Sequence, residues 1–182
     1  MDWLIRVATL DDRPELEQLI AASARGLSRG DYRDEQIESA LATGVFGVDT
    51  DLIRDGTYFV VESDGRLIGC GGWSRRKTLF GGDRFAGRQA EELDPRTEPA
   101  KIRAFFVHPD WSRRGIGRRI LERCELEARA DGFRSVEMMA TLPGVKLYRA
   151  LGYIAGDPVL YEMDDGVRIE ILPMRKSLDD PG

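Results

Sequence analysis

The 182-residue sequence contains one histidine and two cysteines, and it has no run of about 18 apolar residues such as a membrane-spanning helix needs. Cys70 and Cys124 lie far apart in apolar stretches, so they match neither a zinc-ligand pattern nor a disulfide framework. Asp2 near the start argues against a signal peptide. We therefore expect a cytoplasmic protein with buried, reduced thiols, no metal and no membrane contact.

The sequence also lacks a basic excess and a nucleotide-triphosphate loop. Its formal net charge is −5, which argues against a general nucleic-acid binder, and no Gly-Lys-Ser/Thr triplet occurs. The hydrophobic fraction of 42% is typical of a globular protein. We predict a single domain over residues 1–182 with its own hydrophobic core.

Hydrophobic periodicity and turn residues predict an alternation of strands and helices. The predicted strands are 3–7, 57–62, 67–73, 100–107, 135–140, 159–163 and 167–174. The predicted helices are 11–25, 33–42, 115–130 and 145–151. This order predicts a mixed sheet of about seven strands flanked by helices, an α/β domain (α+β by some schemes).

Several turns are specified locally. Asp64-Gly65 between two apolar runs predicts a hairpin, and 164–166 predicts another. Thr9 and Asp12 have the spacing of a capping box. The glycine- and proline-interrupted segment 74–99 is interpreted as a long excursion of the functional or mobile kind, in which a helical piece within 85–93 is an open alternative.

The most informative stretch passes from the predicted strand 100–107 into the predicted helix 115–130. Gly115 and Gly117 open that helix, and Arg113, Arg114 and Arg118 flank them. A helix start presents unpaired amides and partial positive charge, and glycine permits close approach of an anion. These features predict a phosphate or pyrophosphate site. Taken alone, the arginines also fit a solvated helix face or a basic patch.

A second pattern follows the predicted strand 135–140. Tyr148 lies on a short predicted helix that ends at Gly152 and is followed by Tyr153. A tyrosine in this position can direct its hydroxyl into a cleft between strands. By itself, however, the pattern is better explained by a core tyrosine whose hydroxyl is satisfied locally.

Together the two patterns resemble the GNAT superfamily of N-acetyltransferases. The family's acetyl-CoA motif, an apolar-x-Val-x-Pro segment followed by Gln/Arg-x-x-Gly-x-Gly/Ala, is matched by Phe105-x-Val107-x-Pro109 and by residues 112–117. Its Tyr-x-x-x-Gly-Phe/Tyr motif is matched by residues 148–153. Ser112 departs from the pattern, since the family has Gln or Arg there, and the adjacent arginines could supply the charge.

The resemblance implies a mostly antiparallel sheet with a V-shaped splay between its fourth and fifth strands. It implies acetyl-CoA as co-substrate, a small-molecule or peptide primary amine as acceptor, and Tyr148 as general acid toward the CoA thiolate. A catalytically silent CoA-binding or sensor module is the alternative, and a homodimer is left open. The cofactor-binding residues that it implies are Phe105, Val107, Arg113, Arg114, Gly115, Ile116, Gly117 and Arg118.

The acceptor side is less determined by the sequence. Trp73 and Phe80 are predicted wall residues, and the basic cluster 75–77 could meet an anionic acceptor. Arg103 either binds an acceptor carboxylate or is a sheet-edge charge in solvent. The sequence does not identify the base that accepts the amine proton. The candidates are Glu91, Glu92, Asp94, Glu98 and His108, of which His108 is more readily explained as a turn residue.

Overall fold

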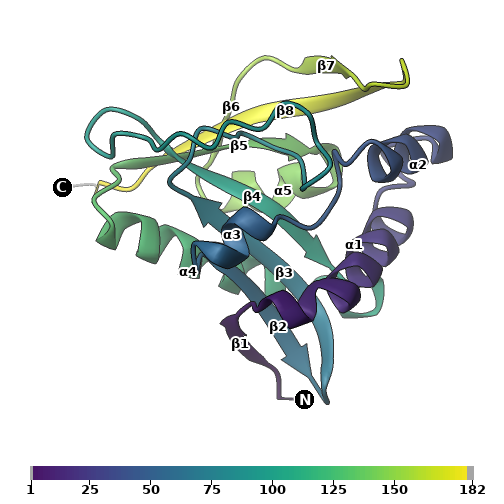
Figure 1. Cartoon of the computed structure of the whole chain (residues 1–182), viewed down its shortest axis with the longest axis horizontal. Coiled ribbons are helices and arrows are strands. Elements are labelled where there is room, and N and C mark those ends of the chain that lie inside the picture. The colour runs from purple at the N-terminus through teal and green to yellow at the C-terminus, as the bar shows by residue number, and fades with distance from the viewer. Residues whose placement is uncertain (1, 180–182) are drawn as a thin grey trace.

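The computed structural model describes residues 2–179, whose strands form one eight-stranded sheet (Figure 1). The strand order is β1-β2-β3-β4-β5-β8-β6, and β7 also pairs with β8. The strands are β1 Leu4–Val7, β2 Tyr58–Ser63, β3 Arg66–Ser74, β4 Ala100–Val107, β5 Ser135–Thr141, β6 Ile154–Ala155, β7 Val159–Glu162 and β8 Arg168–Ser177. All pairs are antiparallel except β4 with β5.

Helices cover both faces of the sheet. The helices are α1 Arg13–Leu27, α2 Asp34–Ala42, α3 Thr50–Arg54, α4 Ile116–Ala130 and α5 Val145–Ala150. Helices α1 to α3 lie on one face and α4 and α5 on the other (Figure 1). Within residues 2–179, none of them is long and apolar enough to cross a bilayer.

Each face of the sheet has its own hydrophobic core, and β2 contributes buried side chains to both. Tyr58 and Val60 pack with α1 and α2, whereas Phe59 and Val61 pack with α4. The buried face of α4 consists of Ile116, Ile120, Leu121, Cys124 and Ala128. Both cysteines are free and buried.

The predicted turns are confirmed. Asp64 and Gly65 have φ values of 49° and 72°, as a two-residue hairpin with primed turn geometry requires. The Thr9 amide donates to the Asp12 carboxylate at 2.8 Å in a capping box. Two elements were not predicted: the five-residue α3, which Asp49 caps by accepting from the Leu52 amide, and the two-residue β6. Both are too short to show hydrophobic periodicity.

The predicted splay between β4 and β5 is confirmed. The two strands pair only at Ala100 with Val136 and at Lys101 with Glu137, and they then separate. A bulge bends β4 at this point, because Ala104 and Phe105 together lie opposite Gly71 of β3. Ala104 adopts a φ of 55° there. The bulge thus turns the second half of β4 away from β5.

The segment 75–99 is closely tied to the fold, and the helical piece within 85–93 was a wrong alternative. Its arms run antiparallel, with the Lys77 amide donating to the Glu91 carbonyl at 2.9 Å and the Thr78 amide to the Gln89 carbonyl at 3.0 Å. Arg88 fastens the segment to α3 by donating to Asp51 at 2.5 Å. The tip of the excursion is thereby held against the sheet face that α3 covers.

Candidate active site

Where β5 diverges, β4 presents an open backbone edge. The His108 amide donates to the Ile68 carbonyl toward β3 at 2.9 Å. The Val107 amide points the other way and donates to the Ser23 hydroxyl of α1 at 3.2 Å. Since successive residues direct their backbone groups to opposite edges of a strand, Phe105 faces the same open edge as Val107. A further extended segment can pair there, with one amide already bonded to Ser23.

The turn after β4 delivers unpaired amides to the start of α4. Arg113 and Gly115 both have left-handed backbones, with φ values of 61° and 81°, and Gly115 is the N-cap. The first amides of the helix have no intrahelical acceptor. A Cβ built on Gly115 would meet no described atom within 4 Å. The space in front of these amides is therefore open, as an anion site requires.

A cavity of about 600 Å³ joins this edge to this helix start. Its cationic lining residues are Arg113, Arg118 and Lys146, and the described lining contains no carboxylate. The structure brings eight of the nine predicted site residues together here. They are Phe105, Val107, Arg113, Gly115, Ile116, Gly117, Arg118 and Tyr148.

Arg114 is the predicted residue that does not line this cavity. Its guanidinium carbon lies 4.8 Å from the ring centroid of Trp111, and it borders an adjacent surface hollow with Arg118 and Arg119. Ser23 and Lys146 line the cavity but were missed as site residues. In the sequence, Ser23 is only one member of the predicted helix 11–25. Lys146 is only a charged residue two positions before Tyr148.

Tyr148 lies at the end of this cavity, on α5. Its ring is 8% exposed and packs edge-on to Phe105, with centroids 6.4 Å apart. A Cβ on Gly144 would lie 2.7 Å from that ring, so glycine is needed for this contact. Burial raises the pKa of Tyr148 well above its ordinary value. Within residues 2–179 its hydroxyl has no hydrogen-bond partner, unlike the Tyr153 hydroxyl, which donates to Glu125 at 2.9 Å.

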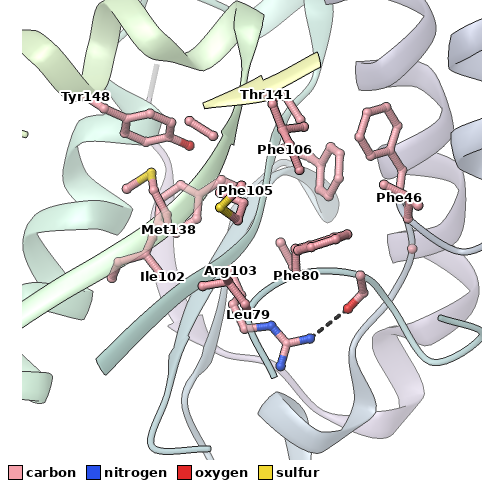
Figure 2. Close-up of a pocket in the computed structure, with 17 residues that line it drawn as sticks. Phe46, Leu79, Phe80, Ile102, Arg103, Phe105, Phe106, Met138, Thr141 and Tyr148 are labelled. Atoms are coloured by element: carbon pink, nitrogen blue, oxygen red, sulfur yellow. Dashed lines mark hydrogen bonds between the residues drawn. The ribbon is translucent and has the colours of Figure 1, made fainter. Parts of the chain in front are cut away.

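A second, smaller cavity of about 70 Å³ lies beyond Tyr148 (Figure 2). It shares Phe46, Phe105, Phe106, Thr141 and Tyr148 with the larger one. Met138 and Ile102 lie on one side of it, and Phe106, Phe46 and Phe80 on the other (Figure 2). The predicted wall residue Phe80 is thus present, and its ring packs on Phe85 and Tyr161.

Arg103 lies at the lower end of the smaller cavity in Figure 2. It is 4% exposed, so the interpretation as a solvent charge at the sheet edge was wrong. Its guanidinium donates to the Gly81 carbonyl at 2.7 Å and pairs with the fully buried Asp49. Asp49 also accepts from Arg88 at 2.8 Å. Burial lowers the pKa of Arg103, and the Asp49 charge opposes that effect.

Several predicted acceptor-side residues lie elsewhere. Trp73 is 2% exposed in the core and donates to Glu127 at 3.4 Å, so it is not a wall residue. The basic cluster lines neither cavity, and its members Arg75, Arg76 and Lys77 pair with Asp131, Asp55 and Glu91. All five base candidates also lie outside both linings. The His108 ring instead accepts from the Asp110 amide at 3.2 Å, as a turn residue does.

No group of three or more histidine, cysteine, aspartate or glutamate side chains in the described chain is arranged to hold a metal ion. The site offers backbone amides, cations and a tyrosine. An anion can bind at the α4 start, an extended chain can pair with β4, and a proton donor stands where the two cavities meet.

Comparison with known proteins places this site in a family. Residues 54–155, more than half of the chain, match the model of the acetyltransferase (GNAT) domain. No curated protein matches the sequence. The chain belongs to the GNAT acetyltransferases, and it is an N-acetyltransferase of that family.

Solved structures share the fold. A GCN5-related N-acetyltransferase from Rhodopseudomonas palustris superposes with a TM-score of 0.72 at 19% identity, over 97% of this chain and 96% of that one. The PaiA N-acetyltransferase of Thermoplasma acidophilum, solved with coenzyme A, gives 0.66 at 16% identity, over 97% and 99%. YncA of Salmonella typhimurium, a putative acetyltransferase solved with acetyl-CoA, gives 0.63 at 17% identity, over 100% and 97%.

Proposed function

We propose that this protein transfers an acetyl group from acetyl-CoA to a primary amine by direct attack of the amine. The observation that carries the proposal is the place of Tyr148, which lines both cavities and whose hydroxyl has no hydrogen-bond partner within residues 2–179. The larger cavity takes the cofactor and the smaller one the amine. The thioester then lies at the shared residues, with the proton donor beside its sulfur.

The start of α4 holds the pyrophosphate in this proposal. The amides of residues 116–118 are aligned with the helix dipole, and Arg113 and Arg118 add charge-assisted hydrogen bonds. Gly115 keeps the approach open, and Arg114 acts from the adjacent hollow. Lys146 extends the cationic lining from the α5 side.

The pantetheine arm pairs with the open edge of β4. The backbone groups of Phe105 and the carbonyl of Val107 are available for this pairing. The Val107 amide is bonded to Ser23, so a pantetheine carbonyl gains that amide only when the Ser23 hydroxyl turns away. Ser23 therefore competes with the cofactor for one hydrogen bond.

The reaction balances with groups of this chain. The amine nitrogen forms a bond to the thioester carbonyl carbon, and the carbon–sulfur bond breaks. The Tyr148 hydroxyl gives its proton to the leaving sulfur, and the surplus proton of the new amide nitrogen restores that hydroxyl. Burial raises the pKa of Tyr148, so the donor is protonated at neutral pH. A thiol with a pKa of about 8.5 is a moderate leaving group, which general acid catalysis assists.

Two measurements test the proposal. Titration with CoA should show saturable binding to the folded protein, and a panel of amines should contain at least one that releases free thiol from acetyl-CoA. Binding without thiol release across the panel would instead indicate a silent CoA-binding module. No binding at all would refute the proposal.

A further inference from the structure

We propose that the acceptor is a compact apolar primary amine with no second positive charge, and that it enters the smaller cavity as the neutral amine. The inference rests on the proposed function. Its basis is the lining of that cavity within residues 2–179, which is aromatic, aliphatic, methionine or glycine apart from Arg103, Thr141 and Tyr148. No aspartate, glutamate or histidine is present in it to accept an ammonium proton or to bind a second cation.

The charges around the cavity disfavour an ammonium ion. Arg103 on β4 is the one permanently charged side chain in the described lining, and it is positive. Its counter-charge Asp49 is fully buried and already bonded to Arg88, which also pairs with Asp51. Tyr58, Cys70, Tyr148 and Tyr161 also lie against the lining elements, and each has a raised pKa and stays neutral. An ammonium group would lose hydration there and gain no partner.

The size of the cavity limits the acceptor further. Its volume of about 70 Å³ is roughly half of the 150 Å³ or so in which an apolar cavity takes up benzene. It therefore suits an amine on a short apolar group. A diamine short enough to fit would place its second ammonium against Arg103 or the phenylalanine rings.

Entry as the neutral amine makes the acceptor's own pKa a determinant of specificity. An α-amine has a pKa of about 7.7–8.0 and a lysine ε-amine about 10.4, so at neutral pH their neutral fractions differ by roughly 300-fold. With no side chain to remove the proton, the neutral fraction of the amine enters kcat/KM as a factor, while the lower nucleophilicity of a less basic amine acts in the opposite direction. The pH at which kcat/KM levels off is therefore set by the pKa of the acceptor itself.

Ethylamine and its 2-fluoro, 2,2-difluoro and 2,2,2-trifluoro derivatives test this with little change in size, because each fluorine lowers the amine pKa. The pH dependence of kcat/KM is measured for each by thiol release from acetyl-CoA, using the wild-type protein. We expect the rising limb to inflect at the pKa of each amine and to move down along the series. An inflection at one common pH for all four would overturn the inference, since it would reveal a base on the protein.

A charged analogue of the same size gives an independent test. At equal concentrations of the neutral amino group, kcat/KM for ethylenediamine should be at least about tenfold below that for ethylamine, whereas neutral glycinamide should be used well. Equal use of ethylenediamine would overturn the inference. Absence of CoA binding to the wild-type protein would refute the proposed function itself. Turnover in which kcat/KM inflects at one common pH for all four amines would refute this inference alone.

A variant tests the missing carboxylate directly. Leu79 lines the smaller cavity, and Leu79→Glu places an acid in its wall, with Leu79→Gln as the control of equal shape. We expect Leu79→Glu to raise the kcat/KM of ethylenediamine relative to ethylamine by about tenfold and Leu79→Gln to leave the ratio unchanged. An unchanged ratio in a Leu79→Glu protein whose circular dichroism is native would contradict the inference.

Discussion

The two cavities that meet at Tyr148 are built in different ways. The larger one takes much of its lining from one stretch that runs from β4 through a turn into α4, joined by residues of α1 and α5, and its charged lining residues are cationic. The smaller one is apolar and takes its walls from Phe46, Phe80, Arg103 and Met138, which lie on separate elements. A cofactor common to a family can be held by one local motif, whereas an acceptor is selected by side chains that only the tertiary fold brings together.

The largest expected effect lies where the two cavities join. Tyr148→Phe keeps the ring against Gly144 and Phe105 but removes the proton donor. We expect kcat to fall by about 10²–10⁴-fold while the Kd for CoA stays within twofold. Stopped-flow or steady-state measurement of thiol release gives kcat, and calorimetric titration with CoA gives the Kd.

Tyr153→Phe is the matched control for that change. Tyr153 packs 5.9 Å from Tyr148, centroid to centroid, but its hydroxyl donates to Glu125 and lines neither cavity. The Tyr153→Phe protein should lose about 1 kcal/mol of its free energy of unfolding and little activity. An equal loss of kcat in both variants would mean that the ring packing, rather than the Tyr148 proton, matters.

The next effect should be confined to the larger cavity. Gly115→Val fills the open space before the α4 amides and strains a backbone with φ of 81°. We expect the Kd for CoA to rise by tenfold or more, on the order of 1.4 kcal/mol. Gly166→Val is the control, because Gly166 has a φ of 83° and equally open space in the β7–β8 turn. Equal effects of the two variants on CoA affinity would contradict the pyrophosphate assignment.

This difference between the cavities also explains what the sequence could predict. Elements with several periods of hydrophobic repeat, such as α4 and β4, were placed to within a residue, and the β2–β3 hairpin followed from Asp64-Gly65. The residues around the larger cavity were found because the motif is contiguous. Arg103 could not be placed, because its burial depends on Asp49, Arg88 and the path of the 75–99 segment, none of which has a local sequence pattern.

Removal of one positive charge from the lining of the larger cavity should have a smaller effect on CoA binding. Arg118→Gln should weaken CoA binding by about three- to tenfold, in keeping with one charge-assisted hydrogen bond, and should not alter the binding of a pantetheine that lacks phosphates. Arg123→Gln, five residues further along α4 and paired with Glu127 at 2.6 Å, is the control. If pantetheine binding falls as much as CoA binding, Arg118 does not act on a phosphate.

The smallest effect concerns the hydrogen bond between Ser23 and the Val107 amide. Ser23→Ala removes the acceptor of a partly buried N–H, which should lower the free energy of unfolding without ligand by about 1 kcal/mol. The same amide then becomes available to a pantetheine carbonyl, so CoA should raise the Tm of this variant by more than it raises that of the wild type. Ser28→Ala, which lines the same cavity, is the control. A CoA-induced rise in Tm no larger than that of the wild type would show that the β4 edge at Val107 does not pair with the cofactor.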